Sequence, residues 1–342
     1  MTFSAPLPPR LAHRASVTDR ATQRAEARKY VFLLLDQFTH LAFSCAIEPL
    51  RLANHAAQQP LYTWQTCSES GNSAQASNGI SVLVDSGLSP LGGRETLVIV
   101  GGKTPRQAIS QQLLGYLRRR QAHGVKIVGI CSATSVLALA GLIENQSCAV
   151  HWELSDAFAE LHPGVRVVDG TFTLDQVPTA AGGAAVADLM LHLIGLDHGT
   201  ELAGRVADLM VYSGIRGPQA PQTTSLQARY GMRSRPLAAA IRLMEANLEE
   251  PLCMGDVAKA AGLSVRQMER LFARHLDESP NRHYIALRMS KARNLLTQTE
   301  MPVIDIALAC GFISASHFSK KYREHFGQSA HQNRASGSSA AL

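Results

Sequence analysis

The sequence of 342 residues lacks several features that decide the class of many proteins. No apolar run approaches the roughly 20 residues that a membrane-spanning helix needs, and residues 1–29 contain no apolar core typical of a secretory signal. The six cysteines include no CxxC pair, which is typical neither of a zinc site nor of a disulfide framework. We therefore expect a cytoplasmic protein in a reducing compartment, without metal, cofactor or membrane contact.

Charge is also scarce, because only 18% of the residues are charged and the net charge is +6. Most of the excess base lies from Gly231 onward, where Lys and Arg outnumber Asp and Glu by five. A bias of this size permits nucleic-acid binding but does not by itself indicate it.

Three segments lack the apolar periodicity of a folded domain. Residues 1–28 contain three closely spaced prolines and few large apolar side chains, which predicts a disordered tail. Residues 213–235 are rich in Gly, Pro, Ser, Thr and Gln, which predicts a linker. The small and polar residues 334–342 predict a second disordered tail. Two domains remain, over residues 29–212 and 236–333.

In the first domain, short apolar runs alternate with helical patterns. The runs TLVIV and VKIVGI are apolar throughout, as is typical of strands buried on both faces. This alternation predicts an α/β fold, with a doubly wound, mostly parallel sheet covered by helices. The expected strands are Tyr30–Leu35, Tyr62–Cys67, Ile80–Val84, Thr96–Val100, Val125–Ile130 and Val165–Val168. The expected helices are Leu41–His55, Pro105–Ala122, Ser132–Leu142, Glu153–Leu161, Ala184–Ile194 and Thr200–Tyr212.

The second domain shows no strand pattern, which predicts an all-α fold. It contains two segments whose residues correspond position by position. Met254–Pro280 and Val303–Ser329 each combine a short helix, a glycine-led turn and a longer amphipathic helix. Gly262 and Gly311 suit the positive φ that is needed just past a helix end. A helix over Asn281–Thr299 joins these two helix-turn-helix units and is long enough to hold their second helices about one DNA turn apart.

The second helix of each unit carries the polar side chains that a reader of the DNA major groove needs. Arg and Lys bond guanine, Gln pairs with adenine, and the remaining bases neutralise phosphates. Two units in register favour DNA binding over the alternative of two ordinary solvated helix faces. The expected DNA-contacting residues are Ser264, Arg266, Gln267 and Arg270 in the first unit, and Ser314, Ser316, His317, Lys320, Lys321 and Arg323 in the second.

Residues 236–333 closely resemble the AraC/XylS-type DNA-binding domain. The resemblance is carried by DVAKAAGLSVRQMERLFARHL, RMSKARNLL and DIALACGFISASHFSKKYREHFG. It implies a transcription regulator with two major-groove helices per subunit, commonly an activator, with double-stranded DNA and RNA polymerase as partners. The family often has Pro soon after its last FG, where this chain has Ala330.

In the first domain, the stretch GICSATSVLALAGL places Cys131 between an expected strand and an expected helix. Ligands of α/β sheets bind at this edge, and hydrolases place a nucleophile on such a turn. The free N–H groups of the helix predict a lowered thiol pKa. His151 is a candidate base, and the backbone N–H groups of Gly101 and Gly102 are a candidate anion site.

These residues together resemble the PfpI-like fold, which is flavodoxin-like and class I glutamine amidotransferase-like. More narrowly, residues 29–212 resemble the sensor half of the GlxA-type subgroup of AraC regulators, through EPLRLAN, ASNGI, VGG, GICSATSVLALAGLIE, HWE, TAAGGAAVADLMLHLI and HGTELAGRVAD. This resemblance implies an effector that is a small nitrogenous metabolite, such as an amino acid or a betaine- or carnitine-like amine. The expected pocket residues are Gly101, Gly102, Cys131, Ser132, His151 and Trp152. Trp152 offers an aromatic face to a cation, or else packs in the core.

Enzymes of the wider superfamily usually place an acidic residue near the start of the first helix, where this sequence has Ala42 and its apolar neighbours. Glu48 follows almost two turns later. We therefore predict a homodimeric, ligand-responsive regulator that is not an enzyme. A cysteine-dependent amidase or hydrolase fused to a DNA-binding domain is the alternative. A redox sensor through Cys131 is a third hypothesis, although the sequence places no resolving cysteine nearby.

Overall fold

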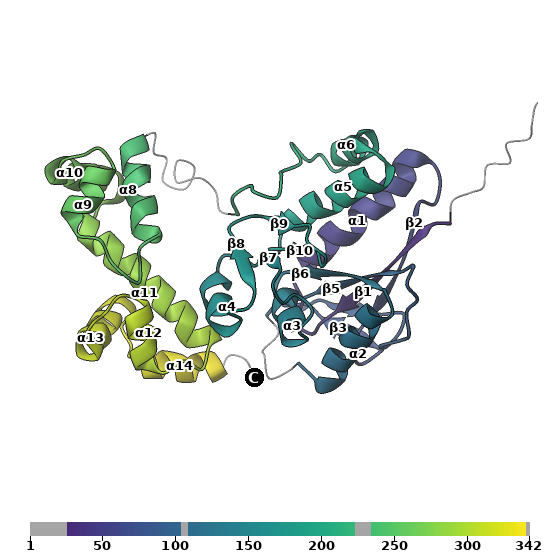
Figure 1. Ribbon diagram of the computed structural model, residues 1–342, viewed down its shortest axis with the longest axis horizontal. Coiled ribbons are helices and arrows are strands. Elements are labelled where there is room, and N and C mark those ends of the chain that lie inside the picture. The colour runs from purple at the N-terminus through teal and green to yellow at the C-terminus, as the bar shows by residue number, and fades with distance from the viewer. Residues whose placement is uncertain (1–25, 104–108, 223–233, 340–342) are drawn as a thin grey trace, which may run out of the picture.

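The computed structural model describes residues 26–103, 109–222 and 234–339. Figure 1 shows an α/β unit formed by the first part of the chain and a helical unit formed by the last part. Within the described ranges, no helix is both long enough and apolar enough to cross a membrane.

The α/β unit is built on a six-stranded sheet with the strand order β2-β1-β5-β6-β10-β9. All neighbouring strands are parallel except β9, which runs antiparallel to β10. Leu34 pairs with Val100 and Val100 with Ile130, so the carboxyl ends of three central strands meet at one edge. The strands are β1 (Arg28–Leu34), β2 (Tyr62–Cys67), β5 (Thr96–Val100), β6 (Lys126–Ile130), β9 (Phe172–Thr173) and β10 (Thr179–Ala180).

Two of the expected strands form outside this sheet. The run at 80–84 becomes β4, which pairs antiparallel with β3, and the run at 165–168 becomes β8, which pairs parallel with β7. Ser81 and Leu83 of β4 are exposed, so this strand has no buried second face and does not fit inside a covered parallel sheet. These elements are β3 (Ser73–Gln75), β4 (Ser81–Leu83), β7 (Ser147–Ala149) and β8 (Arg166–Val168).

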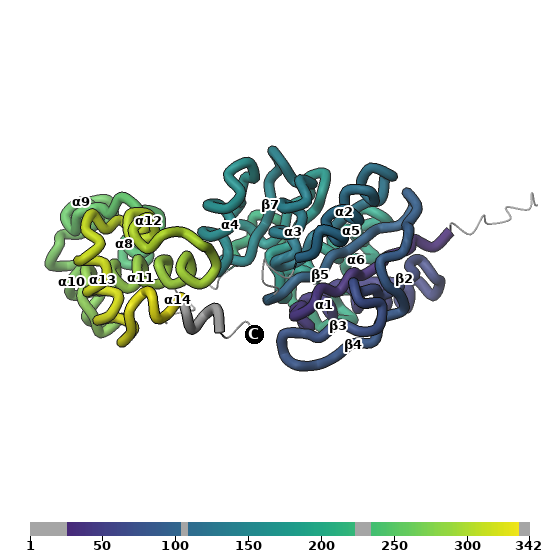
Figure 2. Tube along the Cα trace, turned by 90° about the horizontal axis from the view of Figure 1, so that it is seen from below, coloured from purple at the N-terminus to yellow at the C-terminus, as the bar shows by residue number. Residues whose placement is uncertain are grey.

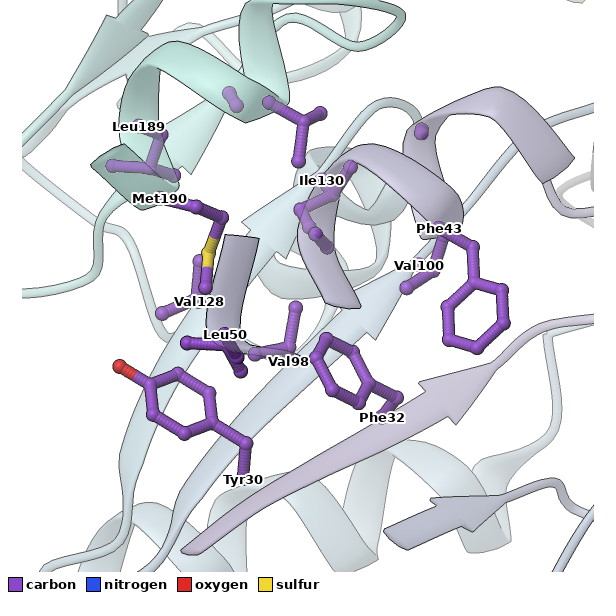
Figure 3. Close-up of a cluster of buried hydrophobic side chains, with 14 of the residues drawn as sticks. Tyr30, Phe32, Phe43, Leu50, Val98, Val100, Val128, Ile130, Leu189 and Met190 are labelled. Atoms are coloured by element: carbon purple, nitrogen blue, oxygen red, sulfur yellow. The ribbon is translucent and has the colours of Figure 1, made fainter. Parts of the chain in front are cut away.

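Helices cover both faces of the main sheet, which confirms the doubly wound α/β fold (Figure 1). Alternate residues of β1 serve the two cores, with Phe32 in one and Leu33 in the other. Figure 3 shows the first core, in which Phe32 and Ile130 of the sheet face Leu50 and Met190 of the covering helices. The helices on this face are α1 (His40–Ala57), α5 (Ala185–His198) and α6 (Thr200–Leu209). The helices on the opposite face are α2 (Gln111–Ala122), α3 (Ala133–Leu139) and α4 (Ser155–Leu161).

The helical unit contains the two expected helix-turn-helix motifs, α9–α10 and α12–α13, joined by α11. Tyr284 of α11 lies in the core of the first motif, and Leu295 and Leu296 of the same helix lie in the core of the second. The helices are α8 (Arg235–Glu245), α9 (Met254–Ala260), α10 (Val265–Leu276), α11 (Pro280–Gln298), α12 (Val303–Ala309), α13 (Ala315–Phe326) and α14 (Ala330–Ser339).

The expected tails differ from the structure where it describes them. Arg28 is already the first residue of β1, and the predictions for residues 1–25 and 340–342 lie outside the described residues. The chain is helical up to Ser339, whereas the sequence predicted a disordered tail from residue 334. Ser329 starts this helix by bonding reciprocally with Gln332, and Arg334 donates to the Met301 carbonyl.

The first half of the expected linker packs against the α/β unit. Arg216 forms an ion pair of 2.7 Å with the fully buried carboxylate of Asp188, and the Thr171 N–H donates to the Pro218 carbonyl at 3.1 Å. A buried carboxylate requires such a partner, and the composition of the linker did not reveal it. The rest of the predicted linker, 223–233, lies outside the described residues.

Candidate functional site

The turn between β6 and α3 holds Cys131 in a strained conformation. Its φ is 59°, in the left-handed region, and its N–H donates to the Ala180 carbonyl at 2.9 Å. Two glycines crowd this turn. A Cβ atom at Gly182 would lie 3.1 Å from the cysteine sulfur, and one at Gly101 would lie 2.4 Å from the Ala133 nitrogen. The elbow expected from the sequence is thus present, and neighbouring segments of the chain hold it tightly.

The thiol of Cys131 is buried, with 8% of the residue exposed. Burial raises its pKa above the ordinary value, and the nearby Glu153 carboxylate adds to this rise. Hydrogen bonds from the Thr39 hydroxyl and the Ser132 N–H act in the opposite direction but are outweighed. The prediction of a lowered pKa is therefore wrong, because desolvation exceeds the effect of the helix N-terminus.

Thr39 is the residue that the sequence reasoning missed beside the thiol. Its hydroxyl oxygen lies 3.8 Å from the Cys131 sulfur, and it directly precedes α1. Ala42 is buried in the core, and Glu48 forms an ion pair of 2.6 Å with Arg51 on the same helix. The position of Thr39 just before the first helix was the available signal.

His151 and Trp152 follow β7 and form a surface cluster with Glu153. The His151 Nδ1 lies 3.8 Å from the Glu153 carboxylate and accepts the Glu153 N–H at 3.4 Å. The rings of His151 and Trp152 have their centroids 5.7 Å apart. Trp152 is 47% exposed, which excludes simple core packing. His151 thus lies next to both an aromatic ring and a carboxylate, two groups that attract cations.

The glycines expected to bind an anion serve mainly in packing. The Gly101 N–H donates to the Ile130 carbonyl at 3.1 Å, so it is already used inside the sheet. A Cβ atom at Gly102 would lie 2.1 Å from the Gln37 carbonyl oxygen. The Ser132 hydroxyl, in contrast, is buried and has no hydrogen-bond partner among the described residues. Ser132 is therefore a polar group at the elbow whose hydrogen-bonding capacity is not used by the described residues.

A separate cavity of about 210 Å³ opens at the same edge of the sheet. Its walls follow the ends of β1 and β2 and the start of α2, and Cys131 is not part of them. The lining residues are Leu34, Leu35, Asp36, Ser68, Glu69, Ser70, Ser73, Ala74, Ile109 and Leu113.

In the first helix-turn-helix unit, Ser264 caps α10. Its hydroxyl accepts the Gln267 N–H at 3.2 Å, and the Gln267 side chain accepts the Ser264 N–H at 2.8 Å. This reciprocal cap occupies the Gln267 oxygen that was expected to face a base. Arg266 and Arg270 are exposed on α10.

In the second unit, Ser314 caps α13 by accepting the His317 N–H at 3.4 Å. Lys321 is half-buried and paired with Glu324 at 2.8 Å, so its charge is partly compensated. The sequence reasoning missed Ile313, which is fully exposed just before the cap and is suited to contact a thymine methyl group. The other exposed polar residues that were expected to contact DNA from α13 are Ser316, His317, Lys320 and Arg323.

Comparisons with known proteins agree with this architecture. Residues 257–336 match the helix-turn-helix domain family, and residues 28–196 match the DJ-1/PfpI family. The HTH-type transcriptional regulator CdhR of Pseudomonas aeruginosa is 41% identical over 312 residues, which cover 90% of this chain and 92% of that protein. This chain belongs to the GlxA-type AraC family of transcriptional regulators.

Two further members extend the comparison. The regulator GbdR of Pseudomonas aeruginosa is 39% identical over 297 residues, covering 86% of this chain and 81% of that protein. The regulator GlxA of Rhizobium meliloti is 35% identical over 302 residues, covering 87% and 92%. The helical unit of this AraC-type regulator is accordingly a DNA-binding domain.

Arg288 of α11 binds the turn between α12 and α13 in this DNA-binding domain. Its guanidinium donates to the carbonyls of Cys310 and Gly311, each at 2.7 Å, and lies 3.8 Å from the centroid of the Phe312 ring. These contacts hold the turn of the second unit against the joining helix. The placement of α13 relative to α10 in the regulator is therefore fixed by side-chain bonds as well as by α11 itself.

Proposed function

We propose that this regulator senses a small nitrogenous metabolite, an amino acid or a betaine- or carnitine-like amine, at the Cys131 elbow. It acts in the cytoplasm as a homodimeric activator that recruits RNA polymerase, and its α/β unit binds the effector without turning it over. Dimerisation follows from the need to place two DNA-binding domains on repeated half-sites.

The observation that carries this proposal is that the exposed Trp152 ring and the Glu153 carboxylate both lie next to His151. A quaternary or protonated amine is attracted by both groups, and a cation over an aromatic face gains about 0.5–2 kcal/mol. The raised pKa of Cys131 keeps its thiol neutral at pH 7, so Glu153 supplies the negative charge. We assign the carboxylate of an amino acid or betaine to the Ser132 hydroxyl, which is buried and has no hydrogen-bond partner among the described residues.

On the DNA side, we assign base reading to Arg266 and Arg270, since bidentate bonds of Arg to guanine are the commonest specific contact. Lys320 and Arg323 are assigned to phosphates, with Ser316 and His317 beside them. The start of α10 is capped by Ser264 and Gln267, and the start of α13 by Ser314. We assign these residues mainly to capping, which also orients the first backbone N–H groups of each helix toward a phosphate.

A thermal-shift screen of the full chain against amino acids and quaternary amines tests the effector. A ligand at about 100 times its Kd raises the unfolding free energy by about 2.7 kcal/mol. The rise should be largely lost in Trp152→Ala and Glu153→Gln, and retained in Trp64→Phe, which changes the other tryptophan. Equal rises in all four proteins would place the ligand elsewhere, and the cavity between β1, β2 and α2 would be the next site to examine.

One observation favours the alternative of a cysteine-dependent amidase or hydrolase. Cys131 keeps the strained left-handed φ of a nucleophile elbow. Its buried, protonated thiol and the threonine in place of an acid favour binding instead. Turnover across an amide and dicarbonyl panel that disappears in Cys131→Ala would establish the enzyme.

A further inference from the structure

The segment 150–161, called here the coupling segment, lies between the candidate pocket and the DNA-binding domain. It begins with Val150, carries the cluster of His151, Trp152 and Glu153, and ends with α4. Both views show α4 beside α11, the long helix that joins the two helix-turn-helix units (Figures 1 and 2).

One end of this contact is apolar. Ala157 of α4 is 4% exposed, and it is buried in the same cluster as Leu296 and Ile306 of the DNA-binding domain. Next to it, the Gln298 side-chain amide at the end of α11 donates to the Glu153 carbonyl at 3.0 Å. Glu153 thus offers its carboxylate to the pocket cluster and its backbone to the DNA-binding domain.

The start of the connection between the domains is bonded to the same segment. The Gln222 amide nitrogen donates to the carbonyls of Val150 at 2.9 Å and Gly170 at 2.8 Å, and its oxygen accepts the Trp152 N–H at 2.9 Å. The chain therefore leaves the α/β unit from the loop that carries Trp152. Two separate connections, Gln222 and Gln298, converge on one short segment.

We propose that the coupling segment transmits effector occupancy to the DNA-binding domain, with Gln298 and Gln222 as its positioning residues. The proposal rests on the proposed function in that the pocket must bind an effector. A ligand seated on Trp152 and Glu153 shifts the position of the DNA-binding domain by its differential affinity for the two arrangements. Helices α10 and α13 lie on the side of their domain away from the α/β unit (Figures 1 and 2), so the contact orients these helices and does not cover them.

Coupling of this kind is reciprocal, so DNA binding must change the surroundings of Trp152 even without an effector. The chain has two tryptophans, and Trp64→Phe leaves Trp152 as the only one. The test titrates this full-length variant with a labelled duplex that the full chain selects from a random pool. Anisotropy of the label reports binding, while Trp152 emission and its quenching by acrylamide report the coupling segment.

We expect the duplex to change the quenching of Trp152, and Gln298→Ala to reduce that change by about twofold or more. Ala157→Asp, which breaks the apolar part of the contact, and Gln222→Ala should act in the same direction. Gln112→Ala, at an exposed position on α2, is the matched control and should leave the change intact. The complementary Trp152→Phe protein, which reports only Trp64, should show no change.

Three results would overturn the proposal. The first is a duplex that binds without changing the quenching of Trp152. The second is a quenching change in Gln298→Ala and Ala157→Asp that is as large as in the parent variant. The third is a quenching change at Trp64 that equals the change at Trp152. Because no effector is present, a failure to identify the metabolite leaves this test intact. If the protein does not bind the duplex, the anisotropy of the label stays constant, so this failure is recognised separately.

Discussion

The two helix-turn-helix units have the same backbone design in different surroundings. Gly262 and Gly311 have φ values of 70° and 73° at the same place in the turn. A Cβ atom at Gly262 would meet no atom within 4 Å, whereas one at Gly311 would lie 2.6 Å from Pro251 Cγ and 2.7 Å from the Leu248 carbonyl oxygen. The turn of the second unit is thus pressed against the loop after α8, while that of the first faces open space.

The second helices differ in the same way. In helix α10, Gln267 takes part in the N-terminal cap, and Arg266 and Arg270 are exposed. Two exposed arginines suit bidentate hydrogen bonds to guanine. Helix α13 presents Lys320 and Arg323 behind the fully exposed Ile313, which suits phosphate binding and contact with a thymine methyl. We therefore propose different roles for the second helices of the two units.

Substitution of the turn glycines should give the largest difference between the units. Gly262→Ala should lower the free energy of unfolding by about 1–2 kcal/mol, because the left-handed conformation is costly for any residue with a Cβ. Gly311→Ala should cost about 4 kcal/mol or more, since steric overlap adds to that strain. Denaturant unfolding followed by circular dichroism measures both, and equal losses would remove the packing difference.

Arg270→Ala sharpens the comparison at the level of sequence reading. It should cost about 1–3 kcal/mol on the best duplex and relax the preference at one base pair. Binding to a set of single-base variants of the selected duplex measures this loss. A uniform loss across all variants would assign Arg270 to phosphate instead.

Lys320→Ala should weaken binding to every duplex alike and reduce the slope of log K against log salt by about 1. Lys321→Ala should have a smaller effect, because Glu324 already pairs with Lys321 at 2.8 Å. Titrations at several salt concentrations separate the two, and a larger slope change for Lys321 would contradict the ion pair.

The smallest effect is expected for Gln267→Ala. Loss of the reciprocal cap on α10 should lower stability by about 0.5–1 kcal/mol and leave the base preference unchanged. The same duplex set as for Arg270 provides the control. If Gln267→Ala instead changes the preference for adenine at one position of the duplex, Gln267 contacts that base.

The sequence predicted those features of the fold that depend on local patterns. The bounds of Tyr62–Cys67 and Thr96–Val100 agree with β2 and β5, and both helix-turn-helix units were found from their periodicity and glycine turns. Strand β7 and the two-residue strands β9 and β10 were missed, because such short segments form only where a neighbouring strand is available.

The elbow at Cys131 was predicted from sequence, but the chemical environment of its thiol was not. The elbow at Cys131 follows from one motif, whereas the rise in its pKa comes from burial, which outweighs the hydrogen bond from Thr39 in a distant segment. The bond from Gln298 to Glu153 joins residues 145 positions apart, and no local pattern indicates it. Nonlocal packing therefore decides how the sensor is built.

The most direct test of the account is a hydroxyl-radical footprint of the full chain on a duplex that it selects from a random pool. We predict that each bound subunit protects two adjacent segments about one helical turn apart, because α10 and α13 are held on one domain by α11. Protection of a single segment per subunit would contradict the rigid pairing of the two units. No protection at low salt would contradict DNA recognition itself.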